Sequence, residues 1–439
     1  MTTRRGGAIP PRTYHAAVVK YIGSKRVLVP VIERVASLLP IRSVCDLFAG
    51  TTRVGQAFRR AGVVVHSNDT ATYSEALGHA YIAAGDDVDR ARIRELLAHL
   101  GSLEPAHGYF TETFCIRSRY FQPHNGMRVD AIRAEIDRLS LTAVERGLLL
   151  TSLIEAADRV DSTCGLQMAY VKEWAPRSFA DLELREPKPV PGPSGVVTRM
   201  DANELAPGLS GLDCAYLDPP YNQHSYFSNY HIWETLMRWD EPETYGIACK
   251  RIDCRTAKSA YNSKRLASQS LAHLIELLPT PWTIVSFNNE GYHDLDVVAA
   301  LLGEKGYVRS VAIDFKRYVG AQIGIYNPSG EKVGRVSHLR NKEVLFIAGP
   351  DEALVERAVA AIGRSSSSGE QQVEQDVRVA AQPAALRGER VEVEGDHVAQ
   401  LDELPVADQL LVHRAEPPAE RREHRDPQRD RLAVHRPAR

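Results

Sequence analysis

Cys214-Ala215-Tyr216-Leu217-Asp218-Pro219-Pro220-Tyr221 is an apolar, strand-like run that ends in an acid, two prolines and a tyrosine. Proline has a fixed φ and no amide hydrogen, so the two prolines end the strand and predict a stiff, extended loop. In an open α/β sheet, ligands bind beyond the carboxyl ends of the strands. The stretch therefore predicts an α/β fold with a ligand site at this loop.

The side chains of this loop suit an aromatic amine. The Asp218 carboxylate and the Pro219 carbonyl accept hydrogen bonds, and neither prolyl nitrogen can donate one. The ring of Tyr221 offers a flat face to a planar base. We therefore predict that Asp218, Pro219, Pro220 and Tyr221 form a pocket for an exocyclic amine such as the N6 group of adenine. An Asp-Pro-Pro turn is also a common end of a strand, so the motif alone leaves both interpretations open.

A strand, a turn of small residues and a helix are predicted upstream, over residues 43–61. This pattern is typical of a nucleotide-binding α/β unit, with the helix expected over residues 54–61. Thr52 replaces the middle glycine of the dinucleotide fingerprint, which favours a cofactor without a diphosphate. A second strand ends at Asp69, at a distance from the turn that suits a carboxylate on ribose hydroxyls.

Residues 20–26, Lys-Tyr-Ile-Gly-Ser-Lys-Arg, precede an apolar pattern of helical spacing that continues to Leu39. A helix is expected to begin near Ser24, with Lys25 at its mouth. A helix N-terminus beside a lysine favours a carboxylate or a phosphate. An ordinary exposed helix start is the alternative.

These motifs, in this order, resemble those of the Dam-like DNA adenine methyltransferases over residues 18–348. The resemblance implies S-adenosylmethionine as the cofactor and a Rossmann-like class I methyltransferase mixed sheet as the fold. It also implies that Lys25 and the loop at residues 48–51 lie around the methionine end of the cofactor, Asp69 at its ribose and Asp201 at its adenine. A bare Asp201 would equally cap the following turn. The expected cofactor-binding residues are Tyr21, Lys25, Asp46, Phe48, Ala49, Gly50, Thr51, Asp69 and Asp201.

One departure from the family pattern concerns the turn after the first strand. The family usually has glycine where this chain has Thr52. If Thr52 cannot adopt the backbone angles that glycine allows, cofactor affinity is expected to fall.

The chain is expected to divide into four parts. Residues 1–17 are predicted to be a flexible arm, and residues 18–72 and 195–349 the catalytic domain. Residues 73–194 are predicted to be a mostly helical insertion, with helices over residues 76–84, 89–100, 128–139 and 142–159. Residues 350–439 lack bulky apolar residues and are predicted to be a disordered tail, whose composition also resembles a frame-shifted reading of a GC-rich gene.

Cations mixed with aromatic and amide side chains indicate where DNA would bind. In the insertion, residues 114–128 suit phosphate and base contacts, and a solvated cap over the cofactor is the equal alternative. A second cluster follows Tyr221, beside the predicted amine pocket, and a third lies between residues 316 and 342. The DNA-binding candidates are Tyr226, Asn229, Lys250, Arg251, Arg255, Lys258 and Arg317. An ordinary solvated surface is the alternative for these cations.

Composition sets the remaining expectations. The net charge is −2, so a surface for nucleic acid has to come from local clusters. No apolar run is long enough to span a membrane and no signal region is seen, which predicts a cytoplasmic protein. The six cysteines form no Cys-x-x-Cys pair, and no metal site is predicted.

The residues and the resemblance together predict a site-specific methyltransferase that acts on the N6 amine of adenine in double-stranded DNA. The target base must leave the helix, because its amine is inaccessible inside a duplex. Methylation of the N4 amine of cytosine is one alternative, and a degenerate, non-catalytic DNA-binding protein is another. A nicotinamide-dependent oxidoreductase is disfavoured by the absent diphosphate glycines. The recognition sequence, the oligomeric state and a partner restriction endonuclease stay open.

Overall fold

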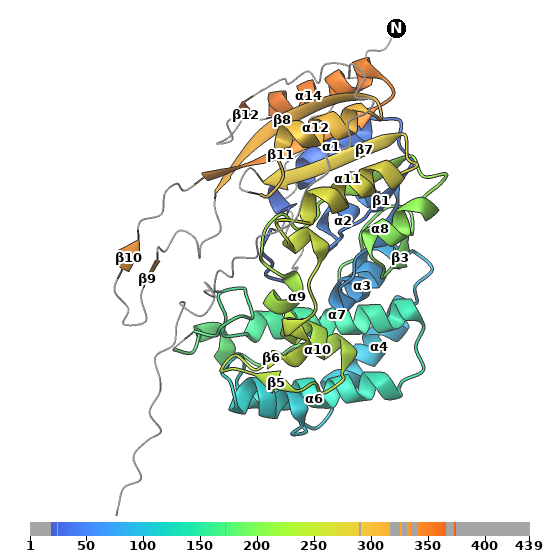
Figure 1. The fold of residues 1–439 in the computed structure, drawn as a ribbon. Coiled ribbons are helices and arrows are strands. Elements are labelled where there is room, and N and C mark those ends of the chain that lie inside the picture. The colour runs from blue at the N-terminus through green and yellow to red at the C-terminus, as the bar shows by residue number, and fades with distance from the viewer. Residues whose placement is uncertain are drawn as a thin grey trace, which may run out of the picture.

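A central eight-stranded sheet carries the candidate site in the computed structural model (Figure 1). The structure describes residues 19–23, 25–171, 173–288, 291–316, 325–326, 332–334, 340–365 and 373–374, so the expected arm at residues 1–17 lies outside the described part. The strand order is β12-β8-β11-β7-β4-β1-β2-β3. The strands are β1 (Ser43–Asp46), β2 (Val64–Asn68), β3 (Val196–Thr198), β4 (Cys214–Leu217), β7 (Trp282–Asn288), β8 (Tyr307–Lys316), β11 (Arg340–Gly349) and β12 (Val373–Glu374).

The direction of the strands confirms the predicted fold class. β3, β2, β1, β4 and β7 are parallel. Their order is that of a doubly wound sheet, in which the strand order reverses between β1 and β4. β11 is antiparallel to both of its neighbours, β7 and β8. The result is the Rossmann-like class I methyltransferase mixed sheet that was expected, and the point between β1 and β4 is where such sheets bind ligands.

Helices cover both faces of the sheet because its strands alternate apolar residues between the two faces. On one face, Val44, Tyr216 and Ile284 pack against α1 (Val29–Leu38), α2 (Arg53–Arg60) and α14 (Glu352–Ser365). On the other face, Cys45 and Ala215 pack against α8 (Ala202–Leu205), α11 (Ala267–Leu277) and α12 (Leu295–Gly303).

α14 corrects the expectation that the chain is disordered after residue 350. Its residues Val355, Ala358, Val359 and Ile362 are buried in the core cluster formed with α1 and the sheet. These positions recur at helical spacing, so a short amphipathic helix is present within a segment of polar average composition. β12 lies further along the same segment and pairs with β8, and the rest of the expected tail is outside the described residues.

The expected helical insertion forms the lower part of the molecule in Figure 1. α4 (Arg90–Gly101) and α7 (Ala143–Val160) match the predicted bounds within one residue, whereas α3 (Thr72–Gly78) and α6 (Pro123–Arg138) begin four and five residues earlier than predicted. Asp89 caps α4 by accepting hydrogen bonds from the amides of Ala91 and Arg92. Thr142 and Glu145 form a capping box at the start of α7. The helices are α3 (Thr72–Gly78), η2 (His79–Ala83), α4 (Arg90–Gly101), α5 (Tyr109–Thr111), η3 (Glu112–Ile116), α6 (Pro123–Arg138) and α7 (Ala143–Val160).

A later segment also belongs to this helical part, which was expected to end at residue 194. α9 (Tyr226–Asn229) and α10 (His231–Arg238) follow the Asp-Pro-Pro-Tyr loop, and Trp233 and Leu236 are buried in the core of the insertion. The buried guanidinium of Arg133 donates to the carbonyls of Leu236 and Met237. The segment after the predicted catalytic loop is therefore anchored to the insertion.

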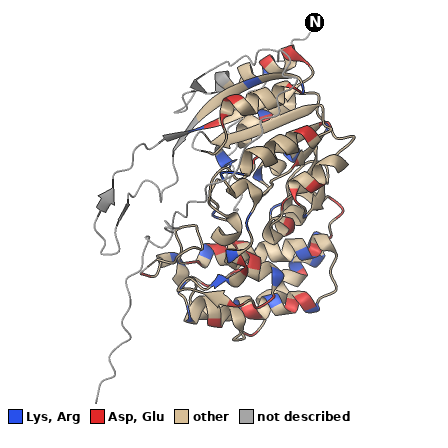
Figure 2. Ribbon diagram, in the orientation of Figure 1, with Lys and Arg blue, Asp and Glu red and all other residues tan. Residues whose placement is uncertain are grey.

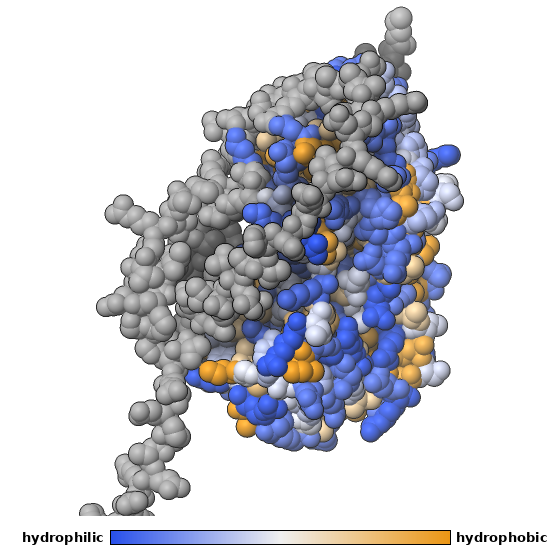
Figure 3. All heavy atoms as spheres, viewed as in Figure 1, coloured by the Kyte–Doolittle hydropathy of each residue, from blue (hydrophilic) through white to orange (hydrophobic). Residues whose placement is uncertain are grey.

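The remaining short elements connect these layers. They are η1 (Lys25–Val27), η4 (Pro176–Phe179), η5 (Ala206–Gly208), η6 (Ile252–Arg255), η7 (Ala260–Asn262), β5 (Thr244–Tyr245), β6 (Lys250–Arg251), β9 (Ile325–Tyr326) and β10 (Lys332–Gly334). Within the described ranges, none of the helices has the length and apolar character needed to cross a bilayer. On the face seen in Figure 3, outside the grey atoms, hydrophobic residues form only small, separate patches.

Candidate functional site

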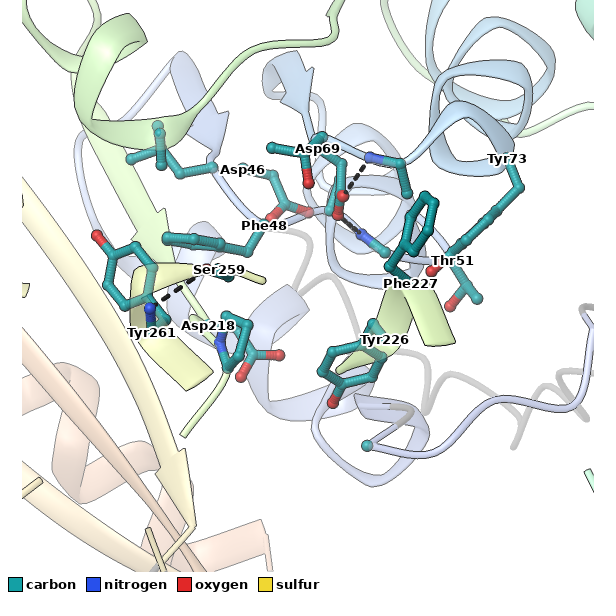
Figure 4. A pocket seen from close by; sticks show the side chains of 18 of the residues that line it. Asp46, Phe48, Thr51, Asp69, Tyr73, Asp218, Tyr226, Phe227, Ser259 and Tyr261 are labelled. Atoms are coloured by element: carbon teal, nitrogen blue, oxygen red, sulfur yellow. Dashed lines mark hydrogen bonds between the residues drawn. The ribbon is translucent and has the colours of Figure 1, made fainter. Parts of the chain in front are cut away.

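A cavity of about 370 Å³ lies at the reversal point of the sheet, between the carboxyl ends of β1 and β4 and the helical part (Figure 4). The structure brings all the expected cofactor-binding residues to its lining: Tyr21, Lys25, Asp46, Phe48, Ala49, Gly50, Thr51, Asp69 and Asp201. Asp218 and Pro220 line the same cavity. Motifs that are far apart in the sequence therefore meet at one site.

In the turn after β1, Thr52 adopts the left-handed backbone conformation that is usual for glycine. Gly50 has φ of 50° and Thr52 has φ of 59°, and both lie in the left-handed region. The amide of Thr52 donates to the carbonyl of Ala49 at 2.7 Å, and its hydroxyl accepts from the side chain of Gln56 at 3.1 Å. A non-glycine residue in this conformation costs about 1–2 kcal/mol. Thr52 therefore adopts the required angles, and the strain is held by its local hydrogen bonds.

Asp46 is a buried carboxylate at the end of β1 with no hydrogen-bond partner of normal geometry in the described part of the chain. Burial raises its pKa to about 8, the charges of Asp218 and Asp69 add to this rise, and the amides of Gly55 and Phe48 oppose it. A buried carboxylate without a partner is costly. Since Asp46 also lines the cavity, it fits a ligand that brings a positive charge.

Asp69 and Asp201 each combine a structural contact with a place in the cavity lining. The Asp69 carboxylate accepts from the amides of Gly50 at 2.8 Å and Ala71 at 2.9 Å, as Figure 4 shows. Asp69 thereby joins the turn after β1 to the loop after β2. Asp201 accepts from the amide of Asn203 at 2.8 Å and caps α8. For Asp201, the capping role and the position in the cavity lining occur together.

Asp218 is part of a buried network of charges at the end of β4. The Lys25 ammonium lies 2.9 Å from Oδ1 of Asp218 and also contacts Oε1 of Glu343. The hydroxyl of Ser286 donates to the same Glu343 oxygen. Burial raises the pKa of Asp218 to about 6, while Lys25 lowers it and Glu343 raises it further. Sequence reasoning did not find Glu343.

The other residues of the Asp-Pro-Pro-Tyr loop lie beside the cavity. Pro219 is buried, and the ring centroid of Tyr221 lies 5.9 Å from the Lys25 ammonium. The carbonyl of Tyr221 accepts from the amide of Tyr292 at 2.8 Å. The loop is thus held to the segment that follows β7.

Tyr21 lies in an aromatic stack that includes one of the DNA-binding candidates. Its ring stacks on Tyr230 at 4.5 Å and on Tyr226 at 5.3 Å between centroids. Its hydroxyl bonds to the hydroxyl of Tyr73 at 3.0 Å. Gly23 is close to the same stack, because an added Cβ would lie 2.7 Å from the Tyr226 hydroxyl.

Residues 257–262 form a strap across the cavity, of which sequence reasoning had named only Lys258, as a DNA-binding candidate. Tyr261 packs edge-on against Phe48 at 5.2 Å between ring centroids, and its hydroxyl donates to Asn203 at 2.7 Å. The side chain of Asn262 donates to the carbonyl of Asn222 at 2.9 Å. The strap therefore links the expected cofactor side of the cavity to the Asp-Pro-Pro-Tyr loop. An aromatic residue inside a basic stretch was the available signal.

The DNA-binding candidates divide by exposure. Lys258 is exposed at the cavity lining, and Arg255 is exposed over the ring of Tyr245. Lys250 is half-buried on β6. Figure 2 shows basic and acidic residues interspersed along the helices of the insertion, so charge alone marks no single face there. Arg317 lies outside the described residues.

Two candidates are corrected by their burial. Arg251 is 2% exposed, and its guanidinium binds both oxygens of Asp240 at 2.6 and 2.7 Å as well as the carboxylate of Asp253. Asn229 is 6% exposed, and its backbone carbonyl accepts from the amide of Gln167. Both side chains are buried, so neither is available to contact a nucleic acid as the sequence had predicted.

The same correction applies to the stretch at residues 114–128. Tyr120, Phe121 and Asn125 are fully buried in the insertion, where Asn125 bonds to the backbone of Ala180 and Leu182. Arg117 remains exposed. The aromatic and amide residues of this stretch therefore belong to the interior of the insertion, so they fit neither base contacts nor the solvated cap that was the alternative.

The fold is that of an α/β methyltransferase, and the Asp-Pro-Pro-Tyr loop lies beside a cavity where the strand order of the sheet reverses. A family model described as D12 class N6 adenine-specific DNA methyltransferase matches residues 21–287. The chain belongs to this family, which confirms the family predicted from the sequence motifs.

Curated relatives carry names of the same kind. The type II methyltransferase M.NlaIII of Neisseria lactamica is 31% identical over 338 residues, which cover 74% of this chain and 99% of the relative. The modification methylase StsI of Streptococcus sanguinis is 32% identical over 326 residues, covering 70% of this chain and 50% of the relative. The type II methyltransferase M.FokI of Planomicrobium okeanokoites is 31% identical over 284 residues, covering 60% and 42%. The chain thus spans half or less of the length of StsI and M.FokI and nearly all of M.NlaIII.

Among solved structures, a SAM-bound magnesium protoporphyrin IX methyltransferase from Synechocystis PCC 6803 aligns with 74% of this chain and 77% of its own. Its TM-score is 0.25 and its identity is 10%, so this likeness carries no argument.

Proposed function

We propose that this protein transfers a methyl group from S-adenosylmethionine to the N6 amine of an adenine flipped out of double-stranded DNA. The observation that carries this proposal is the position of Asp218: its carboxylate lines the same cavity as all the expected cofactor-binding residues. An amine acceptor and a cofactor pocket that share one cavity are what methyl transfer requires.

The residues of the cavity fit S-adenosylmethionine. The buried carboxylate of Asp46, which has no hydrogen-bond partner of normal geometry in the described part of the chain, would hold a positively charged group of the cofactor. Asp69 would face the ribose, and Phe48 with Tyr261 would pack on the adenine. When bound, S-adenosylmethionine supplies a methyl group activated by a sulfonium. The turn around Thr52 has no diphosphate-binding glycines, in agreement with such a cofactor.

Asp218 and the Pro219 carbonyl would act on the target amine. The lone pair of this amine is delocalised into the base, so the planar amine is a poor nucleophile. Two acceptors for its hydrogens favour the pyramidal form and direct the lone pair into the cavity. This is positioning and electrostatic stabilisation, without a covalent enzyme intermediate. Tyr221 would stack on the flipped base, which has to leave the duplex to reach the loop.

The first test is sequencing of modified bases in DNA from cells that express the full chain. N6-methyladenine in one defined motif is the expected product. Asp218→Ala should abolish it while cofactor and DNA binding persist, and Asp181→Ala is the matched control because Asp181 is exposed and is not part of the cavity lining. Methylation by Asp218→Ala would contradict the mechanism. N4-methylcytosine would favour the alternative amine, and binding without any modified base would favour a non-catalytic DNA-binding protein.

We also propose a cytoplasmic role in restriction and modification, with a restriction endonuclease of the same specificity as a partner. The names of the relatives support this proposal, since they are modification methylases and type II methyltransferases. The expected result is that DNA from expressing cells resists an endonuclease that cuts the same motif when it is unmethylated. Cleavage of fully methylated DNA by every such endonuclease would contradict it.

A further inference from the structure

Three neighbouring strands place polar residues in a row at the edge of the cavity. In the parallel register of β4 and β7, Leu217 lies opposite Val285, so Asp218 follows on beside Ser286. In the antiparallel register of β7 and β11, Glu343 lies opposite Asn288, and Ser286 lies opposite Leu345. Glu343 thus comes from the beginning of its strand, while the other polar residues come from the ends of theirs.

Lys25 lies across this row and joins it. Its ammonium contacts both Asp218 and Glu343, and Ser286 donates to the Glu343 oxygen that faces the ammonium. The side chains of Lys25 and Glu343 are 8% and 7% exposed, and that of Asp218 is 17% exposed. Buried charges are stable when they are paired and hydrogen-bonded. One ammonium is shared here by two carboxylates.

We infer that Glu343 is a positioning residue for methyl transfer. Together with Ser286, it holds the Lys25 ammonium against Oδ1 of Asp218 and leaves Oδ2 of Asp218 to accept a hydrogen from the target amine. The inference rests on the proposed function. Without Glu343, the ammonium has one carboxylate instead of two, and the flexible lysine side chain is free to move along the Asp218 carboxylate and compete with the amine.

Glu343 also contributes charge to the environment of Asp218. The titratable groups that face Asp218 are Lys25 from η1, Asp46 from β1, Tyr216 from β4, Tyr226 from α9 and Glu343 from β11. The pKa values of both tyrosines are raised by burial, so they stay neutral. Loss of the Glu343 charge therefore makes Asp218 easier to ionise, which a purely structural role of Glu343 would not do.

The test compares Glu343→Gln with the wild type in single-turnover methylation at saturating S-adenosylmethionine and DNA, from pH 5 to pH 9. We expect the rate at pH 8 to fall about 10- to 100-fold, as misplacement at a reacting centre does. We expect the acid limb of the profile to move to lower pH, and the Kd values for cofactor and DNA to stay within about 3-fold, because Glu343 itself is not part of the cavity lining. Glu343→Asp keeps the charge and should keep the acid limb of the wild type with part of the rate lost.

Glu352→Gln is the matched control, since Glu352 lies on α14 and bonds to Arg309 away from the cavity. It should leave the rate and the profile unchanged. A wild-type rate and profile in folded Glu343→Gln would overturn the inference, and so would a loss of rate explained entirely by lost cofactor binding.

A second measurement separates this inference from the proposed function. Labelling of Lys25 by an amine-acylating reagent, followed by mass spectrometry, needs no turnover, and we expect it to be faster in Glu343→Gln than in the wild type. Equal labelling would overturn the inference alone. A wild type that methylates no DNA would overturn the proposed function alone.

Discussion

Asp46 on β1 lies directly opposite Tyr216 on β4, and neither the carboxylate of Asp46 nor the hydroxyl of Tyr216 has a hydrogen-bond partner of normal geometry in the described part of the chain. Both belong to the cavity lining. Unsatisfied buried polar groups lower stability, so their presence at a ligand site indicates that the ligand completes them. These two unsatisfied groups therefore lower the stability of the ligand-free protein, and we expect ligand binding to restore it.

Asp46→Asn should raise stability and weaken cofactor binding. The pKa of Asp46 is about 8 in the folded protein and 3.8 in the ordinary case, so between these values the folded state binds more protons than the unfolded state. Stability of the wild type then falls as pH rises through this window. The stability that Asp46→Asn gains over the wild type should grow from pH 5 to pH 9. We expect a higher Tm and a gain of about 1–3 kcal/mol in the free energy of unfolding at pH 9. A gain that does not change with pH would contradict this account.

The same variant should bind S-adenosylmethionine at least about 10-fold more weakly at pH 8, since it loses a charge that faces the cofactor. Calorimetric titration measures this Kd. Asp181→Asn, at an exposed position, should change neither Tm nor Kd.

Thr52→Gly should leave cofactor affinity almost unchanged. The substitution relieves about 1–2 kcal/mol of left-handed strain. It also loses the bond from Gln56 and adds backbone freedom, which together cost about 1–2 kcal/mol. We expect a Kd for S-adenosylmethionine within about 3-fold of the wild type. A gain of 10-fold or more would show that Thr52 distorts the turn. Thr52→Val keeps the strain without the hydroxyl and should lower Tm.

Lys258 and Arg251 should separate DNA binding from stability. Lys258→Gln should weaken DNA binding and lower the slope of log K against log salt by about 0.9, as expected when one phosphate contact is lost. Its Tm should not change, because the side chain is exposed. Arg251→Gln should lower Tm, because it leaves Asp240 and Asp253 without their guanidinium. An unchanged salt slope in Lys258→Gln would place the DNA elsewhere.

A chain that ends at residue 350 should be much less stable than one that ends at residue 376. The shorter chain lacks α14, and so loses Val355 and Ile362 from the core against α1 and the sheet. Each such side chain contributes about 1.5–3 kcal/mol when fully buried. Thermal unfolding of the two chains measures the difference. Equal Tm values would show that α14 adds nothing to the fold.

The sequence reveals the site residues that lie at the carboxyl ends of parallel strands, and it does not reveal those that lie elsewhere on a strand. Polar residues at the carboxyl ends of parallel strands, such as Asp46 and Asp218, were identified because that edge binds ligands. Glu343 reaches the same edge from the beginning of β11, since this strand runs in the opposite direction. A rule based on strand ends cannot find a residue at a strand start unless the direction of that strand is known.

The other differences arise from tertiary pairing. Arg251 looked like surface because Asp240 lies eleven positions away and no local period connects the two residues. α14 was missed because the average composition of the tail hides one short apolar face. For α14, the partner is the α1 surface, which is distant in the sequence; for Arg251, the carboxylates are nearby, but only the fold brings them together around one buried guanidinium.

The position of β11 has a consequence for the order in which the protein becomes active during synthesis. β8 leaves the ribosome before β11, yet within the described sheet its hydrogen-bonded neighbours are β11 and β12, both of which come later. The motifs with Lys25 and Asp218 are complete when residue 221 has been made, but the second carboxylate on Lys25 arrives only with residue 343. A nascent or prematurely terminated chain would carry every recognisable motif of the family and still hold its lysine by one acid instead of two.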